Sequence, residues 1–226
     1  FIQIPIFYIM YKYSKKPLLS IFVYFAFSNF IITFSGLRQS IAMSLCFYGY
    51  KFIKKKKLLF YMLTIIIASF FHISAIICLL LYPLYYLKLD KKKIIFVIAI
   101  IMGCFIFNKQ IVQLANQIYY GESGEIVNTN AYTMLILYFA LLMISFIINS
   151  NDFNYIGLRN ILVCLCIIYT IAPLSNTFTR LGYPLSLYLT IFIPEIVLRI
   201  NIKPNNLIKD ILCYVICISC FFYFLG

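Results

Sequence analysis

The side chains of this chain best suited to acid–base or anion-binding chemistry are two arginines and its single histidine. Arg38 lies in a polar break between two apolar segments, and Arg180 follows a polar run over residues 175–179. A guanidinium binds phosphate or carboxylate through two parallel hydrogen bonds, so two arginines on different helices could hold a diphosphate together. The His72 imidazole has an ordinary pKa near neutrality, which suits a general base or a hydrogen-bond donor to phosphate.

Each of these residues also has a plainer interpretation. An arginine at the end of an apolar segment can place its charge among lipid headgroups while its aliphatic part stays in the membrane. A lone histidine on an apolar surface is more often a packing residue than a catalyst. No Cys, Asp or Glu lies within five residues of His72, and all eight cysteines fall within apolar segments, where packing explains them. The sequence therefore predicts no metal site and no cofactor.

A second group of candidates lies between residues 108 and 130, the longest polar stretch of the chain. Its first part carries apolar residues at i, i+3, i+4 and i+7, which predicts a short amphipathic helix on the outer membrane surface. These residues are Ile111, Leu114, Ala115 and Ile118. Tyr119 and Tyr120 follow as candidate stacking platforms for sugar rings. Glu122 and Glu125 are candidate general bases, or simply solvated loop charges.

The composition excludes a water-soluble protein. Hydrophobic residues make up 64% of the 226 residues and charged residues 11%, and the mean hydropathy is +0.99. A soluble fold of this size cannot bury so much apolar surface. The net charge of +13 comes mainly from lysines clustered between apolar segments, which is typical of topology determinants that face the cytoplasm. The sequence therefore predicts an integral membrane protein with no nucleic-acid partner.

Apolar segments bounded by polar turns predict one all-α membrane domain over residues 1–226, a polytopic helical bundle of about eight to nine segments. No strict two-residue alternation occurs, which argues against a barrel. The predicted segments are 1–11, 17–34, 37–53, 58–87, 94–108, 131–149, 158–175, 181–199 and 207–225. Because the first is too short to cross a bilayer and begins with Phe1, we expect a fragment whose leading helices are missing.

Segment 58–87 is too long for one upright crossing, because thirty helical residues extend about 45 Å. Lysine blocks flank it, at 54–57 and 88–93. If the segment folds back near His72, sixteen of the nineteen basic residues lie on one side of the membrane, whereas a single crossing divides them ten to nine. The exceptions are Arg38, Lys109 and Arg180. The positive-inside rule therefore favours a broken or re-entrant hairpin near His72.

The fold-back places His72 on the same external side as Arg38 and Arg180. The charge count does not impose this result, because the histidine is not counted and the two arginines oppose the majority. Polar groups that share a cavity at the membrane are candidates for function. The sequence thus predicts one outward-facing site that contains both arginines and the histidine.

Three motifs resemble the EpsG family, bacterial membrane proteins that are similar to the Wzy polymerases of polysaccharide assembly. They are Gly-Leu-Arg-Gln at 36–39, Phe-His-Ile-Ser-Ala at 71–75 and Arg-Leu-Gly-Tyr at 180–183, the last followed by Pro194. The resemblance extends over roughly residues 17–194. Each motif alone is weak, but the first two at this separation are fairly specific.

The resemblance implies an enzyme that polymerises polyprenyl-diphosphate-linked oligosaccharide repeat units of exopolysaccharide, capsule or O-antigen. The reaction would take place at the outer face of the bacterial cytoplasmic membrane. The implied base is His72, Glu122 or Glu125. The implied diphosphate- and sugar-binding residues are Arg38, Gln39, Tyr119, Tyr120, Arg180 and Tyr183. The implied partners are the lipid-linked oligosaccharide, membrane lipids, and a chain-length regulator or other polysaccharide-assembly proteins.

Two other functions fit part of the same pattern. A flippase of lipid-linked oligosaccharide would share the outward arginines and the broken segment, since discontinuous helices are common in transporters. No internal inverted repeat is evident in support of it. A membrane acyltransferase would need a catalytic histidine, usually with a nearby acid, and the surroundings of His72 in the sequence lack one.

Overall fold

The computed structural model describes residues 1–27, 29–89, 93–120, 132–148 and 150–200, together with 211, 214, 215 and 218. Within these ranges the chain is almost entirely helical and contains no strand, which confirms the all-α prediction. The helices are α1 (Gln3–Tyr13), α2 (Pro17–Ala26), α3 (Asn29–Ser35), α4 (Leu37–Tyr48), α5 (Tyr50–Lys54), α6 (Leu58–Phe71), η1 (Ile73–Leu80), α7 (Leu81–Tyr86), α8 (Ile94–Ile106), α9 (Asn108–Tyr120), α10 (Thr133–Ile147), α11 (Phe153–Ile171), η3 (Ala172–Leu174), α12 (Asn176–Ser186) and α13 (Leu189–Arg199).

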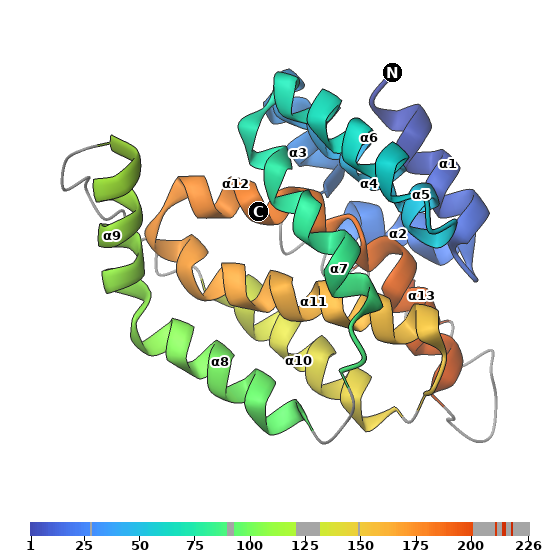
Figure 1. Cartoon of the computed structure of the whole chain (residues 1–226). Coiled ribbons are helices and arrows are strands. Elements are labelled where there is room, and N and C mark those ends of the chain that lie inside the picture. The colour runs from blue at the N-terminus through green and yellow to red at the C-terminus, as the bar shows by residue number, and fades with distance from the viewer. Residues whose placement is uncertain are drawn as a thin grey trace.

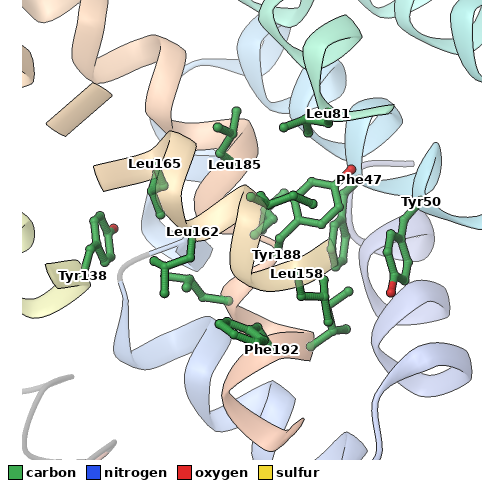
Figure 2. Close-up of a cluster of buried hydrophobic side chains, with 14 of the residues drawn as sticks. Phe47, Tyr50, Leu81, Tyr138, Leu158, Leu162, Leu165, Leu185, Tyr188 and Phe192 are labelled. Carbon is green, nitrogen blue, oxygen red and sulfur yellow. The ribbon is translucent and has the colours of Figure 1, made fainter. Parts of the chain in front are cut away.

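Helix α11 is the centre of the bundle and packs against α7, α8, α10 and α12 (Figure 1). Its sequence is apolar around most of its circumference, which is typical of a fully surrounded helix. Its leucines Leu158 and Leu162 lie beside Tyr188 and Phe192, which follow α12 along the chain (Figure 2). All four side chains are buried, so this cluster joins α11 to the α12–α13 pair.

Several outer helices expose large apolar side chains. Helices α6, α8 and α10 each carry side chains that are at least half exposed. Among them are Leu59, Phe70, Ile95, Phe96, Ile136 and Ile147. Such surfaces are unfavourable in water, but a lipid environment accommodates them.

One described helix is long and apolar enough to cross a membrane by itself, and it is α11 together with η3. The number rises to at most four if three bent pairs each count as one span. These pairs are α2–α3, α8–α9 and α12–α13, with bends of 58°, 68° and 55°. The predicted eight to nine segments are therefore not confirmed, because hydropathy does not reveal bends. The predicted segment 207–225 lies largely outside the described residues.

The structure confirms the break at His72. The residue is extended, with φ −154° and ψ 124°, and separates α6 from η1. Its Nδ1 accepts a hydrogen bond from the Ser74 amide at 3.2 Å, so the side chain caps η1 and the backbone of α6 does not continue. The two arms then lie side by side: the Tyr61 hydroxyl donates to the Cys78 carbonyl, and the Tyr61 and Tyr82 rings are 5.7 Å apart.

The charge count divides the basic residues into a majority, which includes Lys54 and Arg199, and a few exceptions, which include Arg180. These two groups lie toward opposite ends of α11. Near its first residue, Lys54 donates to the Asn154 side chain, and Arg199 pairs with Asp152 at 2.5 Å. Near its last residue, η3 leads into α12, which carries Arg180. The nineteen residues of α11 rise about 28 Å, close to the thickness of a hydrocarbon core. This separation agrees with the charge count, whereas the side of the membrane that each end faces stays a prediction.

A close approach between α7 and α11 makes Gly157 a sensitive position. A methyl group on Gly157 would lie 2.6 Å from two atoms of the Tyr85 ring and 2.8 Å from its Cγ. Tyr85 is 1% exposed and its hydroxyl donates to Asn154 at 2.9 Å, so the ring is held in place. We expect Gly157→Ala to destabilise the protein by about 1–3 kcal/mol through overpacking, measured as a lower midpoint of thermal unfolding in detergent.

Gly103 of α8 supplies the matched control. A methyl group added there meets no atom within 4 Å. Gly103→Ala should therefore raise stability by up to about 1 kcal/mol, because alanine favours the helix more than glycine does. Equal unfolding midpoints for the two variants would contradict the close approach at Gly157.

Candidate functional site

His72 and Arg180 line the same pocket, a cavity of about 360 Å³ between η1, α9 and α12. We call it the cationic pocket. Ser74 of η1 and Asn116 of α9 contribute to its wall, and so does Thr177 of α12. Side chains from three separate elements, the first and last of which are about a hundred residues apart in the chain, therefore converge on one cavity. The structure thus brings together two of the three residues that the sequence predicts for a shared site.

Two helices begin at this pocket. Helix η1 starts directly after His72, and α12 starts directly after Ser175, which also lines the cavity. The first amide groups of a helix have no carbonyl partner within it, and the helix dipole places a partial positive charge there. The Ser175 side chain makes no capping hydrogen bond to α12. At η1 the Ser74 amide is already bound by His72, so the uncapped start of α12 and the Arg180 guanidinium are the groups that favour an anion in this cavity.

His72 is held by Ser74. Its Nδ1 lies 2.6 Å from the Ser74 hydroxyl oxygen, besides accepting the Ser74 amide. Partial burial, and secondarily the positive charge of Arg180, lower the pKa of His72, so the ring is neutral at neutral pH. Because Nδ1 accepts a hydrogen bond, the neutral ring carries its proton on Nε2. His72 thus offers a hydrogen-bond donor, which fits contact with an anion better than proton abstraction.

Neither Arg38 nor Gln39 is among the described residues that line the cationic pocket. The Gln39 amide donates to the Arg180 carbonyl at 3.3 Å and so links the first turn of α4 to α12. Arg38 is exposed in that same first turn, whose N-cap Gly36 has no side chain to cap it. Neither the Arg38 nor the Arg180 guanidinium forms a hydrogen bond or ion pair with another residue that the structure describes. Both charges are therefore available to a ligand.

Tyr183 faces a different cavity from Arg180. It lines a second cavity of about 320 Å³, together with Tyr138 and Tyr169, on another face of α12. We call this the tyrosine cavity. Tyr183 and Arg180 thus line different cavities. Positions 176, 179, 183 and 186 form one stripe along α12, and positions 177, 180 and 181 form the neighbouring stripe.

The predicted helix after residue 108 is present as α9. The face that packs on the bundle carries Val112, which contacts Ile171 and Leu174, while Leu114 and Ile118 of the predicted apolar stripe are exposed. The backbone of Tyr119 and Tyr120 closes this helix. The side chains of those two tyrosines lie outside the described part of the structure. The same is true of Glu122 and Glu125, so their roles stay predictions.

The sequence interpretation missed the residues that begin the two helices at the pocket. Ser74, Ser175 and Thr177 line the cavity, yet none was predicted to do so. A signal existed in the run Ser-Asn-Thr at 175–177, since serine, asparagine and threonine are typical of helix starts. Recognising a helix start there would have placed free amide groups next to Arg180.

The comparisons with known proteins give one result. A family model described as EpsG family matches residues 1–226, the whole chain. No curated protein and no solved structure matches the chain significantly. Together with the apolar helices, the family match indicates a membrane protein.

Proposed function

Because this chain belongs to the EpsG family over its whole length, we propose that it polymerises lipid-linked oligosaccharide repeat units in bacterial exopolysaccharide synthesis. The family is consistent with an exopolysaccharide polymerase. The observation that supports the reaction is the cationic pocket, in which Arg180, the His72 donor and the uncapped start of α12 meet. A polyprenyl diphosphate is an anion that such a pocket suits.

The proposed reaction is a glycosyl transfer. A hydroxyl oxygen of the acceptor unit forms a bond to the anomeric carbon of the donor chain, and the bond from that carbon to the diphosphate oxygen breaks. The diphosphate leaves with the electron pair, and the proton of the hydroxyl passes to a base. Glu122 and Glu125 stay the proposed bases, since His72 presents a proton.

The residues of the cationic pocket would act on the leaving group. Arg180 and the Nε2–H of His72 would stabilise the charge that develops on the diphosphate oxygens, and Arg38 would approach from the first turn of α4. Donors that are already in place do not need to reorganise during the reaction, which is why their contribution to the rate is large. No nucleotide sugar is needed, because the diphosphate is itself the leaving group.

The proposal includes a location. The protein would be a multi-pass protein of the cytoplasmic membrane, with the cationic pocket facing outward. The opposite end of α11, which lies near Lys54 and Arg199 and which we call the lysine-rich end, would face the cytoplasm. Capsule or O-antigen would be alternative products. Its partners would be the lipid-linked oligosaccharide, membrane lipids, and a chain-length regulator or other assembly proteins.

The test of this function is the fate of the repeat unit in cells that lack the protein. We expect polymer to disappear and single lipid-linked units to accumulate on the outer face, where an added glycosidase can reach them. Expression of the wild-type chain should restore the polymer. Accumulation on the inner face would indicate a flippase, and unchanged polymer length would refute the proposal.

A further inference from the structure

The tyrosine cavity lies across α12 from the cationic pocket. Along α12, polar side chains at positions 176, 179, 183 and 186 recur at helical spacing, and all four line the tyrosine cavity. The residues of the cationic pocket, 177, 180 and 181 among them, alternate with these positions. One helix therefore forms a wall of both cavities.

The two cavities differ in charge. The cationic pocket contains Arg180 and His72, whereas no Asp, Glu, Lys, Arg or His is among the described residues that line the tyrosine cavity. The walls of the tyrosine cavity are aromatic instead: the Tyr138 and Tyr169 rings lie 4.8 Å apart in an edge-to-face arrangement, beside Tyr183. A neutral ligand with apolar faces and polar edges suits such walls, and a sugar ring is one.

The polar groups of the cavity offer hydrogen bonds to hydroxyls. The Thr179 hydroxyl donates to the Ala172 carbonyl at 3.0 Å, and the Ser186 hydroxyl donates to Asn29 at 2.6 Å. Each oxygen therefore keeps acceptor capacity. Behind Ser186, the Asn29 Nδ2 is buried and has no hydrogen-bond partner among the described residues. Such an unpaired donor is costly in an apolar surrounding unless a ligand or water satisfies it.

We infer that the tyrosine cavity binds a sugar of the acceptor repeat unit. This inference rests on the proposed polymerase function. A glycosyl transfer needs the acceptor hydroxyl within bonding reach of the carbon that carries the diphosphate. The acceptor site must therefore adjoin the diphosphate site, and a cavity that shares α12 with the cationic pocket does so.

The test measures two probes on the purified full chain in detergent. The first probe is the repeat-unit oligosaccharide, released from the lipid of the producing cells. The second probe is farnesyl diphosphate. We expect Tyr183→Leu to weaken binding of the oligosaccharide about tenfold, because a stacking ring is lost, and to leave binding of farnesyl diphosphate unchanged. Arg180→Ala should weaken binding of farnesyl diphosphate and leave binding of the oligosaccharide unchanged.

Two controls separate loss of the ring from loss of the fold. Tyr183→Phe keeps the ring and should bind the oligosaccharide within about threefold of the wild type, since one neutral hydrogen bond is lost. Tyr11→Leu removes a tyrosine that is 80% exposed on α1 and should change neither affinity. Unfolding midpoints of all variants show whether the fold is intact.

The remaining outcomes each contradict a specific idea. If Tyr183→Leu weakens farnesyl diphosphate and spares the oligosaccharide, the cavity belongs to the lipid site and the inference is wrong. If the wild type binds both probes and Tyr183→Leu changes neither, the inference fails while the polymerase proposal stands. If the wild type binds neither probe, the proposed function itself fails.

Discussion

Replacing Arg180 with alanine is expected to lower polymer synthesis about a hundredfold at normal protein abundance. The magnitude follows from the loss of one preorganised donor to a developing negative charge. Arg180 lines the cationic pocket and is exposed, with no hydrogen bond from its guanidinium to another described residue. Its loss should therefore affect the reaction and not the fold. Polymer yield and chain length in membranes give the measurement.

Lys109→Ala supplies the matched control for Arg180→Ala. Lys109 is an exposed cation at the start of α9, outside the lining of the cationic pocket. Its replacement removes the same formal charge and should leave synthesis unchanged. Equal losses in both variants would show that net charge matters and that the pocket does not.

The single histidine gives a second measurement that does not depend on activity. The charge of Arg180 contributes to the lowered pKa of His72, so Arg180→Ala should raise that pKa. Burial remains in the variant, and the pKa should stay below the ordinary value of histidine. An NMR titration of the imidazole resonances measures both values. An unchanged pKa would place the guanidinium away from His72.

Charge counting predicted the most informative feature of the fold. Lysine blocks at 54–57 and 88–93 must both face the cytoplasm to satisfy the positive-inside rule, and only a bend between them allows this. The bend occurs at His72, where the imidazole accepts the hydrogen bond of the Ser74 amide in place of a backbone carbonyl of a continuing helix. A global constraint on charge and a local capping interaction thus agree on the same residue.

Charge counting could not predict the bends within the other predicted segments. The segment predicted at 181–199 lies across α12 and α13, which meet at 55°. No lysine block interrupts it, and hydropathy is insensitive to direction. The count of eight to nine segments rested on apolar length, which says nothing about whether an apolar stretch is straight.

The sequence also could not predict which cavity each face of a helix lines. Arg180 and Tyr183 lie within one turn of α12, so the motif alone suggests a common site. The structure assigns them to different cavities because residues of η1 and α9 line the cavity on one side of α12, whereas residues of α10 and α11 line the cavity on another. Partners of a helix are long-range contacts, and spacing along one helix does not reveal them.

Replacing Arg199 with methionine is expected to destabilise the fold by about 3 kcal/mol, because it leaves a charge without its partner. Arg199 pairs with Glu195 one turn earlier and with Asp152 at 2.5 Å, and its guanidinium lies 4.8 Å from the Tyr155 ring centre. The Glu195 side chain is only 6% exposed. Thermal unfolding in detergent should show a midpoint about 6 °C lower or more.

The double variant tests whether the buried carboxylate is the cause. Adding Glu195→Gln to Arg199→Met removes the unpaired charge and should restore most of the lost stability, because replacing both partners costs less than breaking the pair. Lys12→Met is the control: its exposed contact with Tyr8 should contribute less than about 0.5 kcal/mol. If the double variant is as unstable as Arg199→Met, the loss comes from the contacts of Arg199 with Asp152 and Tyr155. That result would assign the stability of the lysine-rich end to packing around α11 instead of to neutralisation of Glu195.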